Sequence, residues 1–424
     1  MTKKSDAPAI RFKGFSDAWE QRKFDEVFDC TVPNNTLSRA ELSYDEGTVL
    51  NVHYGDVLIK YGSVLDVQKD DIPRIPHRCR EDFNGALLQD GDVIIADTAE
   101  DETTGKACEI GNLQGSAIVS GLHTMVCRPR NRMALGYLGY YLNSNAYHHQ
   151  LLPLMQGIKV LSLSRSNIQK TSVSYPIAVK EQQLIAYYFS QLDNLITLHQ
   201  RKFEKLTNVK KSMLEKMFPQ NGSSYPEIRF KGFTDPWEQR KAIDIADYSK
   251  GNGYSKGDLT DAGTPIILYG RLYTKYQFAI SEVDTFAFPR NGAVYSQGNE
   301  VIVPASGETA EDIARASAVE KSGVLLGGDL NILRPFDFIN PLFLALAISN
   351  GEPQKELAKK AQGKSVVHIH NTDIQEVTIA YPSRTEQDRI VSVFRQLDNL
   401  ITLHQRKLEK LQNIKKSMLE KMFV

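Results

Sequence analysis

Residues 191–218 read QLDNLITLHQRKFEKLTNVKKSMLEKMF, and residues 396–423 read QLDNLITLHQRKLEKLQNIKKSMLEKMF. The two stretches differ only at Phe203/Leu408, Thr207/Gln412 and Val209/Ile414. Neither stretch contains glycine or proline, and the apolar residues recur at the spacing of one face of a helix. The duplicated stretch therefore predicts two copies of one long helix.

Further apolar residues upstream extend each helical stripe, so we expect helices over residues 181–218 and 386–424. Residues 181–218 would form a rod about 57 Å long. Periodic runs of this length are typical of coiled coils. The predicted seam consists of Leu192, Ile196, Phe203, Leu206 and Met213 in the first copy, and Leu397, Ile401, Leu408, Leu411 and Met418 in the second.

The order of segments along the chain predicts that the two helices run antiparallel. Residues 219–385 leave the end of the first helix and return at the start of the second, so an antiparallel pair needs no long crossing connection. Antiparallel pairing also brings Glu181 and Asp193 toward Lys416 and Lys421. Unlike charges favour this orientation.

A second repeat opens each half of the chain. Residues 10–23 read IRFKGFSDAWEQRK, and residues 228–241 read IRFKGFTDPWEQRK. The only two tryptophans, Trp19 and Trp237, occupy the matching position. We expect a packing motif that docks each half onto the helices; the alternative is a pair of rings that stack on nucleic-acid bases.

Two regions that match only weakly, residues 24–180 and 242–385, follow these repeats. Short motifs nevertheless recur in the same order: residues 91–95 with 298–303, 98–101 with 309–312, 126–129 with 332–335, 156–157 with 362–363, and 175–176 with 381–382. Short β-rich runs alternate with polar turns. The predicted fold is therefore mixed α/β (α+β), with two tandem domains at 1–180 and 219–385, each feeding one long helix, related by pseudo-two-fold symmetry.

Composition sets broad limits on the class of protein. The 424 residues suffice for two or three domains, and 51 basic residues balance 51 acidic ones. This balance neither favours nor excludes nucleic acid, because local patches matter more than the sum. The four cysteines show no metal or disulfide spacing. Without a signal peptide or a membrane-spanning run, we expect a cytoplasmic protein.

One group of acids is a candidate for metal chemistry. Its members are Asp92, Asp97, Glu100, Asp101 and Glu102, which could bind Mg²⁺ in a nuclease. The second half breaks the set, since Asp92 corresponds to Asn299 or Glu300 and Asp97 has no clear counterpart. The favoured interpretation is a loop or helix start capped by Thr98 and Thr309. We therefore predict no catalytic residue and no metal site.

Basic residues gather in both variable regions and are candidate DNA contacts. Arginine and lysine bind phosphates, and arginine also reads guanine. The candidates are Arg74, Arg78, Arg80, Arg128, Arg130, Lys159 and Arg165 in the first half, and Arg271, Lys275, Lys360, Lys364 and His368 in the second. A solvated surface is the alternative for any single cluster.

Two diverged halves joined by near-identical helices resemble the specificity subunit of type I restriction–modification systems. The resemblance rests on the duplicated Val-Ile, Arg-Pro, Gln-Gly and Tyr-Pro segments and on the Leu-Asp-Asn-Leu-Ile helices, and it covers nearly the whole chain. It implies that each half reads one half of a split site in double-stranded DNA. It also implies that the helices set the spacing and dock two methyltransferase subunits, and that restriction (translocase) subunits join them.

The same resemblance implies a subunit that is not an enzyme. The sequence shows no fingerprint for S-adenosylmethionine and no phosphate-binding loop. S-adenosylmethionine, ATP and Mg²⁺ are therefore expected on the partner subunits, with no cofactor on this chain. Candidate partner contacts flank the seam: Arg201, Lys205 and Lys211, and their copies Arg406, Lys410 and Lys416.

Two other classes of function stay open at this point. One is a coiled-coil adaptor that binds protein only, which a salt-sensitive DNA-binding assay would separate. The other is a Mg²⁺-dependent nuclease that uses the acids near residues 98–102, which cleavage by the purified chain alone would reveal.

Overall fold

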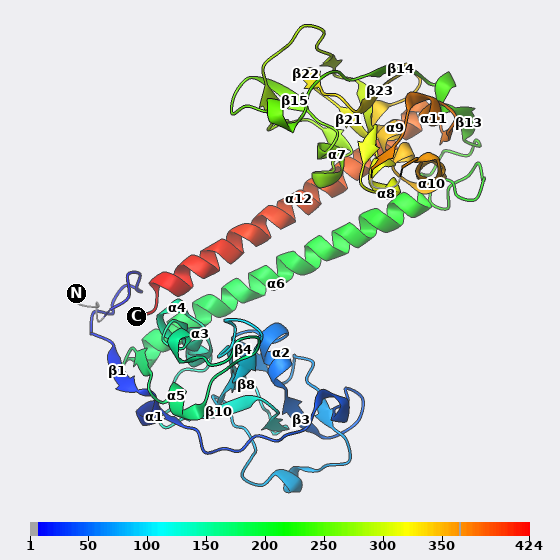
Figure 1. Cartoon of the computed structure of the whole chain (residues 1–424). Coiled ribbons are helices and arrows are strands. Elements are labelled where there is room, and N and C mark those ends of the chain that lie inside the picture. The colour runs from blue at the N-terminus through cyan, green and yellow to red at the C-terminus, as the bar shows by residue number, and fades with distance from the viewer. Residues whose placement is uncertain (1–6, 364–365) are drawn as a thin grey trace. The chain divides into compact units, whose positions relative to one another are not determined.

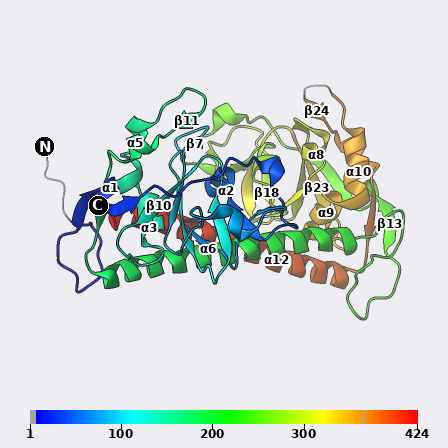
Figure 2. The ribbon, with the colours of Figure 1, turned by 90° about the horizontal axis from the view of Figure 1, so that it is seen from below.

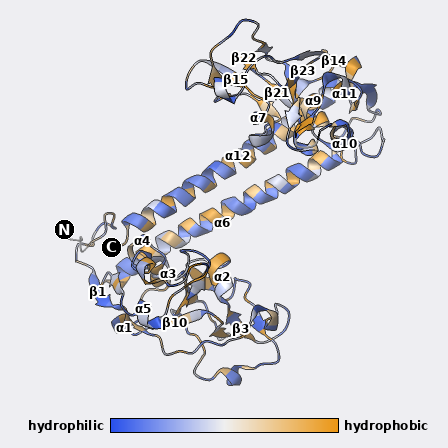
Figure 3. Ribbon diagram, in the orientation of Figure 1, coloured by the Kyte–Doolittle hydropathy of each residue, from blue (hydrophilic) through white to orange (hydrophobic). Residues whose placement is uncertain are grey.

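The computed structural model describes residues 7–363 and 366–424. Two helices of 38 residues each stand out, α6 (Val179–Lys216) and α12 (Arg384–Lys421) (Figure 1). Each helix begins two residues before its predicted start and ends before its predicted last residue. The apolar residues after each helix, such as Phe218 and Phe423, pack into a domain core. In Figure 3 both helices are largely hydrophilic, with apolar residues recurring along them.

The chain divides into two compact units. Unit 1 holds the chain up to Gln200 together with Arg406–Val424, and unit 2 holds Arg201–Gln405. The division passes through both long helices, whereas the predicted domain boundaries lay at the helix ends. Each unit therefore contains the first part of one long helix and the last part of the other.

Unit 1 is built on a five-stranded sheet in the order β2-β10-β6-β8-β4 and a three-stranded sheet in the order β5-β3-β9. The strands of these sheets are β2 (Phe28–Asp29), β10 (Thr124–Pro129), β6 (Val93–Ala96), β8 (Ala107–Gly111), β4 (Val64–Asp66), β5 (Arg74–Ile75), β3 (Val49–Val52) and β9 (Ala117–Ser120). Two short pairs join β1 (Glu20–Lys23) with β12 (Ser172–Tyr175) and β7 (Thr98–Ala99) with β11 (Leu161–Ser162). The helices are α1 (Phe24–Val27), α2 (Tyr54–Ile59), α3 (Tyr137–Leu142), α4 (Asn145–His148) and α5 (Arg165–Ile168).

Unit 2 repeats this plan with a five-stranded sheet in the order β14-β23-β19-β21-β16 and a four-stranded sheet in the order β17-β15-β22-β18. Its strands are β14 (Ala246–Lys250), β23 (Leu330–Pro335), β19 (Glu300–Pro304), β21 (Ser317–Val319), β16 (Ala279–Ile280), β17 (Phe286–Ala287), β15 (Thr264–Ile267), β22 (Ser322–Leu326) and β18 (Tyr295–Gln297). Two short pairs join β13 (Glu238–Lys241) with β25 (Thr378–Tyr381) and β20 (Ser306–Gly307) with β24 (Val367–His368). The helices are α7 (Arg271–Thr274), α8 (Ala310–Ile313), α9 (Pro341–Ile348), α10 (Gly351–Lys360) and α11 (Asn371–Gln375).

The helix pair is antiparallel in each unit. In unit 1, Leu192 near the start of α6 shares a core with Leu411 and Met418 near the end of α12. In unit 2, Met213 near the end of α6 packs against the core that also takes Leu397 from α12. The predicted orientation is therefore confirmed, and all ten predicted seam residues are buried or half-buried.

One predicted ion-pair pattern was wrong in detail. Asp193 binds Lys415 at 2.5 Å, one residue short of the expected Lys416. Glu181 turns inward and binds Arg11, with Arg11 Nε 2.6 Å from Glu181 Oε1. Lys421 does not bind Glu181, because the buried carboxylate is already held by a bidentate guanidinium.

The repeat that opens each half of the chain, residues 10–23 and 228–241, contacts both long helices of its unit. Arg11 binds Glu181 at the start of α6, while Ile10 N donates to Lys421 O at the end of α12, 2.9 Å away. In unit 2, Arg229 binds Glu386 at 2.8 Å, and Ile228 N donates in the same way to Lys216 O at 2.9 Å. The repeat therefore joins the end of one long helix to the start of the other.

The two tryptophans pack in the cores, as predicted. Trp19 is 6% exposed, and its ring lies 6.3 Å from that of Phe423, which follows α12. Trp237 is 2% exposed, and its ring lies 5.9 Å from that of Phe218, which follows α6. The base-stacking alternative is wrong, because buried rings offer no face to a base. Over residues 7–363 and 366–424, every helix is too short or too polar to cross a membrane.

Candidate nucleic-acid interface

Strand register shows which residues of the two units are equivalent. Cys127 lies opposite Val93 in unit 1, as Leu333 lies opposite Val301 in unit 2. Carried along the strands, this register places Thr98 of β7 at the position of Ser306 of β20. The paired hairpin strands agree, since Ser162 lies opposite Thr98 and His368 lies opposite Ser306.

The predicted match of residues 98–101 with 309–312 was therefore wrong by three positions. Thr309 does cap a helix, because its Oγ1 accepts from Asp312 N at the start of α8. Thr98 lies within a strand and caps none. The same four residue types therefore serve different local structures in the two halves. They begin on strand β7 in unit 1, whereas in unit 2 they follow strand β20 and begin helix α8.

The candidate magnesium ligands do not converge. Asp92 is buried and binds Arg128, whereas Asp101 accepts from Thr103 N at 2.9 Å within an exposed turn. In the described part of the chain, no cluster of three or more His, Cys, Asp or Glu side chains is arranged to hold a metal ion. The geometry therefore gives no support to the metal-dependent nuclease.

Arg128 serves the fold of unit 1. Its guanidinium donates to both carboxylate oxygens of Asp92, at 2.8 and 2.7 Å, and to Leu87 O at 3.1 Å. The bond to Asp92 raises the pKa of Arg128. Arg334 and Glu300 occupy the equivalent positions in unit 2, 3.7 Å apart. A guanidinium engaged in this way is not free for a phosphate, so Arg128 loses its support as a DNA contact.

Three candidates in unit 2 are also engaged. Arg271 and Lys275 both bind Asp284, at 2.6 and 2.5 Å. Hydrogen bonds from the Lys275 ammonium, the larger cause, and from the Arg271 guanidinium lower the pKa of Asp284 to about 2. Lys360 forms an ion pair with Glu376. Lys364 lies outside the described residues. The first three are therefore less suited to binding phosphate than their sequence positions suggested.

The six remaining candidate DNA contacts of unit 1 are exposed and bind no carboxylate among the described residues. Arg80 and Arg130 donate only to backbone carbonyls, those of Gly115 and Asp25. Arg74 and Arg78 lie close to Arg80 in sequence, Lys159 lies within a hairpin, and Arg165 follows that hairpin. All six are exposed: Arg74, Arg78, Arg80, Arg130, Lys159 and Arg165.

Lys159 lies in a tight hairpin of unit 1. Gln156 and Ser162 exchange two backbone hydrogen bonds, 3.0 and 2.8 Å long. Gly157 has φ +126°, and a Cβ there would lie 1.9 Å from Val160 O, so the turn requires glycine. Ile158 at the tip is fully exposed. Within unit 1, β7 and β11 lie on the side away from α6 (Figure 2).

Unit 2 builds the same hairpin from different residues. Gln362 and His368 exchange two backbone hydrogen bonds, 3.1 and 2.8 Å long. Gly363 has φ +141°, and a Cβ there would lie 1.9 Å from Val366 O. The Gln-Gly motif thus has one structural role in both units, which confirms this part of the predicted alignment.

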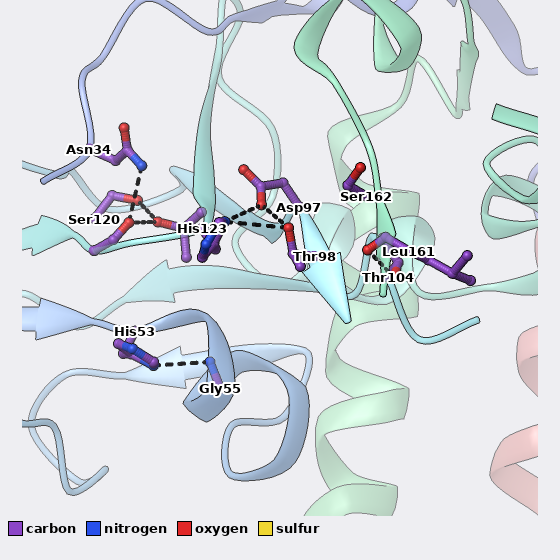
Figure 4. A network of polar contacts seen from close by, with 12 residues as sticks. Asn34, His53, Gly55, Asp97, Thr98, Thr104, Ser120, His123, Leu161 and Ser162 are labelled. Carbon is purple, nitrogen blue, oxygen red and sulfur yellow. Dashed lines mark hydrogen bonds and ion pairs between the residues drawn. The ribbon is translucent and has the colours of Figure 1, made fainter. Parts of the chain in front are cut away.

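A corner of polar side chains lies beside the hairpin of unit 1 (Figure 4). Thr98 Oγ1 donates to Asp97 Oδ1 at 2.8 Å, and His123 Nδ1 lies 3.3 Å from the same oxygen. The side chain of His123 is 47% exposed and that of Asp97 is 25% exposed. No motif in the sequence points to His123, because its contact with Asp97 joins two segments that only strand pairing brings together.

Comparisons with known proteins agree with this geometry. Residues 16–208 and 234–413 match the family described as the type I restriction modification DNA specificity domain. The chain therefore belongs to this family, which confirms the resemblance seen in the sequence.

Individual relatives are distant. The chain is 21% identical to the type I restriction enzyme MjaVIII specificity subunit of Methanocaldococcus jannaschii, over 57% of this chain and 59% of that protein. It is 21% identical to the putative type I restriction enzyme MjaX specificity subunit of the same organism, over 95% of this chain and 92% of that protein. The crystal structure of a type I restriction–modification S subunit from M. genitalium superposes with a TM-score of 0.63 at 13% identity, covering 99% of both chains. That structure confirms the fold.

Proposed function

We propose that this chain is the DNA-reading subunit of a type I restriction–modification complex and recognises a split, asymmetric site. Each unit reads one half-site in double-stranded DNA, and the bases between the half-sites are unspecified. The helices set the distance between the half-sites. The chain itself neither cuts nor methylates DNA.

One observation carries this proposal: equivalent framework positions are kept in both units, while the exposed positions beside them differ. The hairpins share the Gln-Gly turn and the paired strands, yet Ser162 of unit 1 is replaced by His368 in unit 2. A protein that binds the same ligand twice has no reason to differ there. Two unlike half-sites account for both the shared framework and the divergence.

The exposed cations account for affinity, because lysine and arginine side chains bind phosphates without regard to sequence. Arg74, Arg78 and Arg80 are close in the sequence of unit 1, Lys159 lies within the hairpin, and Arg165 follows it. The neutral total charge gives weak attraction to DNA in general. Tight binding is therefore expected only in the assembled complex.

The long helices offer the same surface twice and suit two copies of one partner. Leu195 and Leu198 on α6 are 43% and 45% exposed, and their copies Leu400 and Leu403 on α12 are 44% and 45% exposed. Exposed leucines in a repeated pattern suit a protein partner better than water. We propose that each pair docks one methyltransferase subunit, and that restriction subunits join this assembly.

The partner subunits would supply the chemistry. Methyl transfer needs S-adenosylmethionine, and translocation with cleavage needs ATP and Mg²⁺; we assign these to the methyltransferase and restriction subunits. The family's role in DNA specificity is consistent with a chain that positions catalysts rather than acting as one.

A map of methylated adenines in DNA from cells that express the chain with its methyltransferase tests the proposal. We expect two unlike half-sites whose centres are about 34 Å apart, one helical turn, or a multiple of that distance. Exchange of residues 24–180 for the same region of a relative should change one half-site only. A continuous or palindromic site, or methylation by this chain unaided, would overturn the proposal.

A further inference from the structure

The polar corner beside the hairpin occurs in both units with its chemistry rearranged. In unit 1 the corner consists of Asp97, Thr98, His123 and Ser162; in unit 2 the equivalent residues are Ala305, Ser306, Asp329 and His368. The backbone is alike, since Asp97 N donates to His123 O at 3.1 Å and Ala305 N donates to Asp329 O at 2.8 Å. An imidazole is present in both corners, but it comes from the loop before β10 in one unit and from β24 in the other.

The imidazole of unit 1 is held in a fixed orientation. His123 Nδ1 lies 3.3 Å from Asp97 Oδ1, and its ring meets the ring of Tyr54 edge-on at 5.3 Å. The loop before it is held as well, because Thr124 Oγ1 and Asn34 Nδ2 both donate to Gly121 O. Among the described residues, Nε2 of His123 has no hydrogen-bond partner, and the ring is about half exposed.

The imidazole of unit 2 is held in a similar way. His368 Nδ1 lies 3.0 Å from Ser306 Oγ, and Ser306 is buried. His368 itself is exposed and lies directly beside the hairpin turn. In both corners, therefore, Nδ1 is engaged by the protein while the imidazole side chain is exposed.

The backbone at His123 adds an independent observation. His123 has φ +53° and its counterpart Asp329 has φ +57°, a left-handed conformation that glycine adopts most easily. Such residues, held by their surroundings, cluster at functional sites. A polar side chain is retained at this position in both units although glycine would relieve the backbone.

The pairing of His123 with the Asp97 carboxylate favours a contact with a base over a contact with a phosphate. A phosphate needs positive charge, which lysine and arginine supply better than an imidazole beside Asp97. In the tautomer that donates Nδ1–H to Asp97, the His123 ring presents Nε2 as a hydrogen-bond acceptor. The base-edge groups that donate in the major groove are adenine N6 and cytosine N4.

We propose that His123 reads an exocyclic amino group of adenine or cytosine in the half-site of unit 1, with Asp97 as its positioning residue. His368 is its counterpart in the half-site of unit 2. This inference rests on the proposed DNA-reading function and adds residues and base-edge chemistry to it.

The test uses the full chain assembled with its methyltransferase, and duplexes in which each base pair of the mapped site is replaced in turn. For His123→Ala we expect discrimination at one base pair of one half-site to fall about tenfold or more. Discrimination at the other half-site should not change. His368→Ala should show the reverse, and Asp97→Asn should weaken discrimination at the same base pair as His123→Ala. His149→Ala, at an exposed histidine of unit 1 that is not one of the corner residues, is the matched control.

His123→Asn guards against loss of folding, because asparagine tolerates the left-handed backbone. This variant should bind with altered preference at the same base pair. Equal weakening on every duplex would indicate a phosphate contact and overturn the inference, as would unchanged discrimination. If the wild-type complex itself has no specific site, the proposed function fails instead, so the two failures are distinguishable.

Discussion

The Lys415 ammonium lies 2.5 Å from the Asp193 carboxylate in unit 1. The copies of these residues, Asp398 and Lys210, make the same contact at 2.5 Å in unit 2. Each lysine lies in the apolar row of its helix, so each seam is closed near its end by an ion pair instead of a leucine. The same pair in two units indicates that one antiparallel register serves both.

Charge reversal at this pair tests the register. We expect Asp193→Lys to destabilise unit 1 by about 1 kcal/mol, because two ammonium groups would meet at a partly exposed site. The double variant Asp193→Lys/Lys415→Asp should recover most of the loss in urea unfolding. Lys416→Asp, at the exposed neighbouring position, is the control and should have little effect. Equal effects of Lys416→Asp and Lys415→Asp would contradict the register.

The ion pair between Arg11 and Glu181 should be more sensitive to substitution than the pair between Asp193 and Lys415. Glu181 is buried and its side chain is 1% exposed, so Arg11→Leu leaves a carboxylate without its partner. We expect a loss of about 3–5 kcal/mol in the free energy of unfolding. Arg11→Leu/Glu181→Leu should restore much of it, because no buried charge is left. Arg22→Ala removes an exposed pair with Glu20 and should cost far less.

Burial raises the pKa of Glu109 to about 7, against its ordinary value of 4.5. The folded chain therefore keeps a proton between these values that the unfolded chain has lost. This contribution is fully present below pH 4.5 and is lost as the pH rises to about 7, a change on the order of 3 kcal/mol. Glu109→Gln should flatten the slope of stability against pH in this window, as measured by urea unfolding. A slope that the substitution leaves unchanged would assign the pH dependence to other groups.

The helices should act as a spacer. Insertion of seven residues near Thr207–Val209, with a matching insertion in α12, keeps the seam in phase because apolar residues recur every seven positions. We expect unchanged half-sites with about three more base pairs between them, at about 1.5 Å per residue and about 3.4 Å per base pair. A five-residue insertion is the control, since it turns the seam out of phase. An unchanged spacer in an active complex would show that another part of the assembly sets the distance.

The exposed leucines should determine how many methyltransferase copies bind. Leu195→Lys/Leu198→Lys should reduce the count from two to one, and the same change at Leu400 and Leu403 should act alike. All four substitutions together should abolish assembly, as read by the mass of the complex. One copy bound by the wild-type chain at saturation would contradict two equivalent sites.

The duplication, the two long helices and their antiparallel order could all be predicted from the amino-acid sequence. Helical period is a local property, so Leu192, Ile196 and Phe203 predict their own face without knowledge of a partner. The orientation followed from connectivity and charge. Repeated motifs such as Gln-Gly and Arg-Pro identified the common framework, because the same local geometry demands the same residues in both halves.

Which polar groups are available for a ligand could not be predicted from the sequence and depends on the folded chain. Arg128 and Arg271 look like phosphate contacts in sequence, yet distant carboxylates engage both. Asp97 and His123 meet because β6 and β10 pair in one register, and a shift of that register would separate them. The partner of a polar side chain often lies on a segment far away in the sequence, and local sequence does not reveal which distant segments the fold brings together.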